Sequence, residues 1–269
     1  MRLVISVAAT VLLSAFGVLP AVAAPAAAPT LDSIVALNNC SASIIRLTSS
    51  QDNDRAIMQT NGHCYEGGFL KAGQVITGKS STRSGTVLNA DGSKKTTVQA
   101  DRVLYATMTD TDVAWYRLTE TYAQLKEKKV TPLELASTHP AKGTQMDVVS
   151  GYWKKIYSCN IDTFVHQLKE SEWTWKDSIR YTSACQTIGG TSGSPIVDRN
   201  TGKAIGINNT GNESGEKCTL NNPCEVDQSG TVTVHKDSHY GQQTYQLYGC
   251  IGAGNAIDPN KAGCTLPKP

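Results

Sequence analysis

Three polar residues that lie far apart in the chain have the types and the order needed for nucleophilic hydrolysis. Ser192 lies in TIGGTSGSPIV, between glycines that let the backbone turn tightly and bring main-chain N–H groups close to a substrate. Because a serine hydroxyl is a weak nucleophile, it needs a base and a group that orients this base. His63 in TNGHC and Asp112 in TDTDVAWYRL supply these two types. The sequence therefore predicts a His–Asp–Ser triad.

The three motifs together resemble those of the chymotrypsin/trypsin-like serine peptidases, in particular bacterial secreted members. TNGHC is similar to the alanine-alanine-histidine-cysteine segment of that family, DVAWYRL to its aspartate strand, and GTSGSP to its GDSGGP motif. The order of the triad agrees with this family and differs from that of subtilisin and the α/β-hydrolases. The resemblance covers roughly residues 40–211. It implies an all-β fold of two antiparallel six-stranded β-barrels, with the active site in the cleft between them.

The resemblance also implies a role for each residue. Ser192 would attack the substrate, His63 would take its proton and deliver it to the leaving group, and Asp112 would orient the imidazole. The backbone N–H groups of Gly190 and Ser192 would form the oxyanion hole. This reading predicts a serine endopeptidase that works through an acyl-enzyme and needs no cofactor and no metal.

Other residues of the same types fit less well. Ser194 falls where the family has glycine or serine and is expected to be structural. Asp101 and Asp110 do not directly precede an apolar strand, as Asp112 does. Four further histidines are expected to be exposed or packing residues, since none follows a strand and precedes a cysteine: His139, His166, His235 and His239. The last two are four residues apart but lie in a strand-to-loop pattern, so we do not expect a metal site there.

The residues around Ser192 in the sequence also suggest a substrate pocket. In the resembled family it lies between the segment before the serine and the strand after it. Gln186 falls where trypsins carry their selective aspartate, and Asn208 falls where glutamyl endopeptidases carry a histidine. With Asn209 and Thr210, these residues predict a polar, uncharged pocket and no particular residue preference. Thr191 replaces the aspartate that pairs with a new N-terminus in animal enzymes, so we expect no trypsin-type activation.

Residues 1–23 have the pattern of a secretory signal peptide. Arg2 is followed by a mostly apolar segment and then by the small-x-small sequence Ala21-Val22-Ala23. A membrane anchor is the alternative, but the apolar segment is short and is interrupted by serine, glycine and proline. Residues 24–33 form an Ala/Pro linker that is too short for a folding pro-domain. The sequence predicts a secreted, extracellular protein.

The net charge and the distribution of apolar residues indicate that function depends on a local site and not on an extended charged or apolar surface. The formal net charge is +2 over 269 residues, with no dense basic tract that would suggest nucleic acid. No later segment reaches the roughly 20 apolar residues of a membrane span. We therefore expect a protein or peptide substrate, no nucleic-acid partner, no membrane attachment after signal removal, and a monomer.

Eight cysteines in an exported chain favour disulfides. The resemblance implies a bridge between Cys40 and Cys64 that clamps the histidine loop. Local bridges are expected between Cys218 and Cys224 and between Cys250 and Cys264, which leaves Cys159 with Cys185. A bridge between Cys185 and Cys218 is the rival, because the family often links the segment before the serine to a later loop.

Short strands separated by polar turns are expected throughout. They include SASIIRL, AIMQT, VQADRVLYAT, DVAWYRL, TQMDVVS, SIRYTSA and the hairpin PIVDRNTGKAIGI, with TVTVH as a further strand and QQTYQLYGC as a strand or a short helix. The predicted organisation is an N-terminal barrel over 34–122, a connection over 123–141, a C-terminal barrel over 142–248, and a disulfide-held tail over 249–269.

Two other functions fit the same residues. A protease-like binding protein could share the fold and be catalytically silent, and the long polar loop over residues 213–230 keeps this alternative open. Against it stands the presence of all three triad residue types. An esterase could use the same triad on another leaving group. Activity on esters without activity on peptides would identify it.

Overall fold

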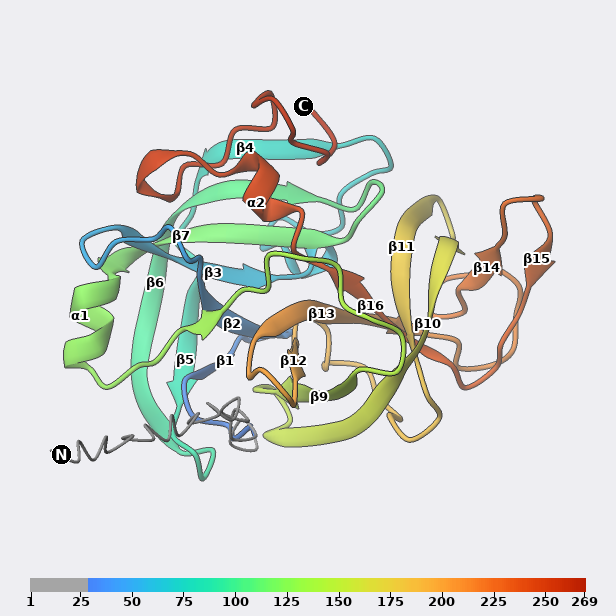
Figure 1. Ribbon diagram of the computed structural model, residues 1–269, viewed down its shortest axis with the longest axis horizontal. Coiled ribbons are helices and arrows are strands. Elements are labelled where there is room, and N and C mark those ends of the chain that lie inside the picture. Colours follow the sequence, from blue (N-terminus) through green and yellow to red (C-terminus); the bar gives the residue numbers. More distant parts are fainter. Residues whose placement is uncertain (1–28) are drawn as a thin grey trace, which may run out of the picture.

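The computed structural model describes residues 29–269, so the predicted signal peptide and the first part of the predicted linker lie outside the described residues. Antiparallel strands make up most of this chain and form two sheets side by side (Figure 1). In chain order the elements are β1 (Ile34–Ala36), β2 (Ser41–Arg46), β3 (Arg55–Thr60), η1 (Gly62–Cys64), β4 (Val75–Ser80), β5 (Ser84–Leu88), β6 (Lys94–Thr107), β7 (Val113–Thr121), α1 (Tyr122–Glu127), β8 (Leu133–Glu134), β9 (Gln145–Ser150), β10 (Lys155–Glu170), β11 (Trp173–Tyr181), β12 (Pro195–Asp198), β13 (Ala204–Gly211), β14 (Cys224–Val226), β15 (Val232–Thr233), β16 (His239–Gln243), α2 (Leu247–Cys250) and η2 (Ala253–Asn255).

The first sheet closes into a six-stranded barrel in the order β1-β5-β6-β7-β3-β2, because β2 pairs back with β1. Strand β4 pairs with β6, and β8 joins β2 in parallel, both outside this ring. Strand β7 is buried on both faces. Ala114 and Tyr116 pack into the barrel core, whereas Val113 and Trp115 pack against the C-terminal segment. This double burial explains why DVAWYRL reads as a continuous apolar run and not as an alternating strand.

The second sheet also closes, in the order β9-β10-β11-β16-β13-β12, through the pairing of β10 with β11 and of β12 with β9. Its core contains Met146, Val148, Ile161, Ile179 and Ile196. The β10–β11 hairpin extends past this ring, and β14 pairs with the outer part of β10. The predicted all-β fold of two six-stranded barrels is confirmed.

Two tryptophans of β11 join the barrels. Trp173 donates its indole N–H to the Leu70 carbonyl at 2.8 Å, and Trp175 donates to the Met108 carbonyl at 3.0 Å. Both rings pack with residues of the first-barrel core. The strand predicted from the sequence begins at Ser178, whereas β11 begins at Trp173. In the first part of β11, buried and more exposed residues alternate, as expected for a strand. The buried residues Trp173 and Trp175 pack against the first barrel, and side-chain periodicity does not show which barrel a strand contacts.

Two other segments differ in extent from the expectation. In TVTVH only Val232–Thr233 forms a strand, β15, whose two residues are exposed. In QQTYQLYGC both alternatives occur, since β16 ends at Gln243 and α2 begins at Leu247. Within residues 29–269 no helix is long and apolar enough to cross a membrane.

Four disulfides tie the described chain together. They join Cys40 to Cys64, Cys159 to Cys185, Cys218 to Cys224, and Cys250 to Cys264. The rival pairing of Cys185 with Cys218 is not formed, because Cys185 lies against β10 and bonds to Cys159 there. Four disulfides fit a location outside the cytoplasm.

Candidate active site

His63 and Asp112 lie at the ends of two paired strands of the first barrel. His63 is in the single turn η1 just after β3, and Asp112 directly precedes β7, which pairs with β3. Asp112 has a fully buried side chain. Its Oδ2 lies 2.7 Å from His63 Nδ1, and its Oδ1 accepts the His63 backbone N–H at 2.9 Å. Because an ionised carboxylate only accepts hydrogen bonds, Nδ1 carries the proton and Nε2 is left as the basic nitrogen.

Opposing effects act on the pKa of His63. Burial by itself lowers this pKa, but the charge and hydrogen bond of Asp112, together with the charge of Glu170, raise it above the ordinary value of 6.5. A histidine with a raised pKa is a stronger base. His63 is therefore well suited to accept a proton from a neighbouring hydroxyl.

Ser192 lies in the turn before β12, and this turn is pressed against the first barrel. The backbone N–H of Ser41 donates to the Ser192 carbonyl at 2.8 Å. Gly193 has a φ of 75°, and a Cβ at this position would lie 2.1 Å from Thr60 Oγ1 and 2.2 Å from the Ser41 carbonyl oxygen. Only glycine permits both this conformation and this close approach. The contact brings the serine loop of one barrel next to β2 and β3 of the other.

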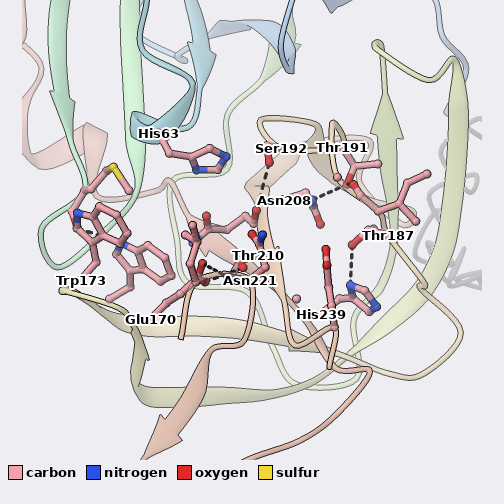
Figure 2. A pocket seen from close by; sticks show the side chains of 18 of the residues that line it. His63, Glu170, Trp173, Thr187, Thr191, Ser192, Asn208, Thr210, Asn221 and His239 are labelled. Atoms are coloured by element: carbon pink, nitrogen blue, oxygen red, sulfur yellow. Dashed lines mark hydrogen bonds between the residues drawn. The ribbon is translucent and has the colours of Figure 1, made fainter. Parts of the chain in front are cut away.

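His63 and Ser192 line one cavity (Figure 2). The Ser192 hydroxyl points to the Asn209 carbonyl, 3.4 Å away, and none of the hydrogen bonds among residues 29–269 joins it to His63. Hydrogen bonds of catalytic groups are often formed only when a substrate is bound. The cavity therefore contains a base and a hydroxyl that are not hydrogen-bonded to each other in this structure.

Two backbone N–H groups beside Ser192 are free to bind a substrate oxygen. In the part of the chain that the structure describes, no hydrogen bond is donated by the N–H of Gly190 or of Ser192. These are the two groups predicted for the oxyanion hole. The N–H groups of Thr191, Gly193 and Ser194 in the same turn donate to nearby carbonyls, whereas those of Ile188 and Gly189 also have no acceptor among the described residues.

Three of the four residues predicted for the substrate pocket line the cavity of Ser192: Asn208, Asn209 and Thr210. Asn208 is buried and fixed, since its amide accepts from Tyr181 and donates to Thr191. Gln186 lies elsewhere. It lines a second cavity, and its side chain donates to the Ser183 carbonyl at 3.0 Å. Its neighbour Thr187 lines the Ser192 cavity instead.

Two titratable residues of the cavity were not singled out as site residues from the sequence. Glu170, at the end of β10, is buried and accepts hydrogen bonds from Thr210 Oγ1 at 2.7 Å and from the Asn221 N–H at 2.9 Å. Burial raises the pKa of its carboxyl. His239, at the start of β16, has its Nδ1 3.0 Å from Thr187 Oγ1, and burial lowers its pKa. The sequence treated His239 as an exposed or packing residue, because only the pairing of β16 with β13 brings it here.

Exposed apolar side chains border the same cavity. Phe69, Ile188 and Leu220 are each more than half exposed, although they are large and apolar. Phe69 packs edge-on against both His63 and Trp173, with ring centroids 5.8 Å and 5.6 Å apart. Exposed apolar groups that surround a hollow are typical of a binding surface.

The rival residues of the sequence analysis lie outside this cavity. Ser194 is fully buried, and its hydroxyl has no partner among the described residues. Asp101 pairs with two arginines and Asp110 with Lys176. Within the described chain, one group of side chains has metal-ligating types and spacing, Cys40, His63 and Cys64. The two cysteines form a disulfide, so this group offers one nitrogen and cannot hold a metal.

Comparison with known proteins identifies the family. The trypsin-like peptidase domain matches residues 45–207, and the chain belongs to this family. A search of curated proteins found no match. Solved structures that resemble this chain include the active form of Rv3671c protease from M. tuberculosis, with 16% identity, a TM-score of 0.49, and coverage of 96% of this chain and 97% of that chain. A Glu endopeptidase has 15% identity and a TM-score of 0.46, covering 79% and 85% of the two chains. A Nocardiopsis protease has 13% identity and a TM-score of 0.44, covering 79% and 90%.

Proposed function

We propose that this protein is a secreted serine endopeptidase in which Ser192, His63 and Asp112 form the catalytic triad. The observation that carries the proposal is the pair of hydrogen bonds that His63 donates to the fully buried Asp112 carboxylate, beside a cavity that His63 and Ser192 both line. A buried carboxylate that orients an imidazole beside a hydroxyl is the arrangement that activates serine. Membership of the trypsin-like peptidase family supports the same conclusion.

In this proposal Ser192 Oγ attacks the carbonyl carbon of the substrate while its proton passes to His63 Nε2. Asp112 stays ionised and stabilises the imidazolium that forms. The proton then passes from Nε2 to the leaving amine, the C–N bond breaks, and the acyl group remains on Ser192. Water repeats the sequence with the same base and releases the acid. The N–H groups of Gly190 and Ser192 bind the negative oxygen of each tetrahedral intermediate, and one such donor contributes about 3–4 kcal/mol.

The first test is covalent labelling of the protein without residues 1–23 by a fluorophosphonate serine probe, with the modified residue located by mass spectrometry. We expect modification at Ser192, none in Ser192→Ala, and a strong loss in His63→Ala. Ser194→Ala is the matched control, because its hydroxyl is buried and unpartnered. Absence of labelling in the folded wild type would overturn the proposal.

A catalytically silent binding protein is the alternative. The contact of the Ser192 hydroxyl with the Asn209 carbonyl, and not with His63, favours it. A crystal structure with a bound peptide aldehyde separates the two. The peptidase requires a bond from Ser192 Oγ to the aldehyde carbon, whereas the silent protein would hold the peptide without this bond.

The substrate pocket belongs to the same proposal. Asn208, Asn209, Thr210 and Thr187 would surround the side chain that precedes the scissile bond, with His239 at its wall. Gln186 is left out, because it lines another cavity. Cleavage of a peptide library by the unmodified wild-type protein, read by mass spectrometry, measures the residue preference that these side chains impose.

A further inference from the structure

A tryptophan outside the cavity contacts the loop that carries Ser192. Trp153 lies in the turn between β9 and β10, and its indole N–H donates to the Gly189 carbonyl at 2.8 Å. The turn itself is well fixed. The backbone N–H of Tyr152 donates to Ser41 Oγ at 3.1 Å, and that of Trp153 donates to Ser150 Oγ at 3.2 Å. The indole N–H is therefore presented to the serine loop by a constrained segment.

This hydrogen bond determines which way one peptide group faces. In a trans peptide the C=O and the N–H point in opposite directions. The Gly189 carbonyl points to Trp153, so the N–H of the same peptide, which belongs to Gly190, points away from Trp153. Gly189 and Ser192 line the cavity, whereas Trp153 does not. The Gly190 N–H, which has no acceptor among the described residues, therefore points away from Trp153 and toward the side where its neighbours Gly189 and Ser192 line the cavity; Gly190 itself is not a lining residue.

The peptide between Gly189 and Gly190 has little intrinsic reason to keep this orientation, because glycine populates many backbone conformations. Gly190 has a φ of 89°, and a Cβ there would lie 2.9 Å from Trp153 Nε1 and about as close to the Tyr152 ring. Among residues 29–269 the Gly189 carbonyl accepts one hydrogen bond, from Trp153. Rotation of this peptide would replace the N–H by a carbonyl oxygen and would repel a negative substrate oxygen.

Trp153 is 48% exposed, and its ring packs edge-on against Tyr152 with centroids 5.0 Å apart. The side chain thus keeps a large apolar area in water while its polar atom is bonded. We propose that Trp153 is a positioning residue for the oxyanion hole. Its indole N–H keeps the Gly189–Gly190 peptide in the orientation that offers the Gly190 N–H to the reacting oxygen. This inference rests on the proposed peptidase function.

The test compares Trp153→Phe with Tyr152→Phe. The first removes the N–H donor and keeps an aromatic ring, and the second removes a hydroxyl that takes part in no hydrogen bond among the described residues. Because one hydrogen bond biases the peptide, we expect kcat for a peptide substrate to fall about 3- to 10-fold in Trp153→Phe, with KM nearly unchanged. Tyr152→Phe should match the wild type in both.

A second measurement excludes a merely structural effect. A peptide trifluoromethyl ketone forms a negatively charged adduct with Ser192, whereas the matching peptide alcohol does not. Trp153→Phe should weaken the ketone about 3- to 10-fold and leave the alcohol unchanged. Equal weakening of both ligands, or no weakening of either, would overturn the inference.

The two proposals fail in different ways. If the wild type shows no fluorophosphonate labelling at Ser192, the proposed peptidase function fails. If the wild type is labelled and cleaves peptides but Trp153→Phe behaves like the wild type, the positioning role alone fails. Equal midpoints of thermal unfolding for the two aromatic variants establish that both are folded.

Discussion

The two halves of the proposed active site are built by different means. The His63–Asp112 half joins the ends of two directly paired strands, and its carboxylate is fully buried and makes hydrogen bonds of 2.7 Å and 2.9 Å. The Ser192 half is a glycine-rich turn whose shape depends on contacts with distant segments. These contacts come from Ser41 and Trp153 on one side and from Asn208 on the other.

The two halves therefore keep their geometry for different reasons. The His63–Asp112 half is held by electrostatic interactions, and the Ser192 half is held by contacts that fix the conformation of its turn. A buried hydrogen-bonded ion keeps its geometry because any other arrangement would leave a charge unsatisfied. A turn with glycines at positive φ has no such internal restraint and relies on the surfaces around it. Changes in the first half should therefore act on proton transfer with little change in structure. Changes in the second half should act on structure and on the free N–H groups.

The largest effect is expected from Asp112→Asn. An amide cannot reproduce the acceptor pair for His63, so the imidazole loses its tautomer and the stabilisation of its charged form. We expect kcat to fall roughly 10⁴-fold, as for triads of this kind, with the fold retained. Steady-state kinetics and circular dichroism check this. Asp110→Asn is the control, because Asp110 pairs with Lys176. A loss of less than tenfold in Asp112→Asn would show that this half does not drive catalysis.

Gly193→Ala should disrupt the packing of the Ser192 turn against the first barrel. The methyl group would meet Thr60 Oγ1 and the Ser41 carbonyl at about 2 Å, and alanine disfavours a φ of 75°. We expect a loss of roughly 2–4 kcal/mol in the free energy of unfolding, measured by urea denaturation, together with loss of Ser192 labelling. Gly189→Ala is the stability control, since no atom lies within 4 Å of the added Cβ. Equal stability of the two variants would contradict the packing argument.

Paired Cys→Ser substitutions that remove one disulfide at a time test whether two regions around the site affect different kinetic constants. The Cys40–Cys64 bridge has a sequence separation of 24 and the Cys218–Cys224 bridge one of 6. Chain entropy predicts losses of about 3.5 and about 2 kcal/mol, respectively, in the free energy of unfolding. Because Cys64 ends the His63 turn, its loss should lower kcat. Loss of the short bridge should raise KM, because Leu220 and Asn221 lie within it and line the cavity. The reverse pattern in kcat and KM would contradict this division.

The smallest effect is expected from Glu170→Gln. Activity requires neutral His63, so kcat/KM rises with pH through the pKa of this histidine. The charge of Glu170 is one of the causes that raise this pKa, so its removal should lower the pKa and shift the acidic limb of the profile to lower pH. The pH dependence of kcat/KM measures the shift. Glu172→Gln, on an exposed residue of the same hairpin, should leave the limb in place. A shift to higher pH would contradict the electrostatic argument.

Much of the fold could be predicted because its signals are local. Alternating and continuous apolar runs located β2, β3, β6, β7 and the β12–β13 hairpin. The same reading missed the first residues of β11, because Trp173 and Trp175 bury their rings in the other barrel. It also placed Gln186 in the substrate pocket by counting back from the serine. The turn over Ile188–Thr191 directs Thr187 to the cavity instead.

The residues of the proposed triad were predicted from short motifs, since each motif combines one functional side chain with the glycine, cysteine or strand residues that position it. Their roles remain predictions that the experiments above test. Glu170, His239 and Trp153 have no comparable signal. They reach the site through the ends of long hairpins and through the register of β13 with β16, which places Gly211 opposite His239.

The sequence by itself determined the strand pattern, the cysteine content, and the order and local setting of His63, Asp112 and Ser192. The tertiary structure alone decided which further side chains, such as Glu170 and His239, line the cavity with His63 and Ser192, and which N–H groups of the serine loop are left without an acceptor. The physical reason is that backbone propensity and side-chain periodicity act over a few neighbouring residues. Strand register, desolvation and the orientation of a single peptide depend on contacts between segments far apart in the chain, such as Trp153 with Gly189 and Ser41 with Ser192.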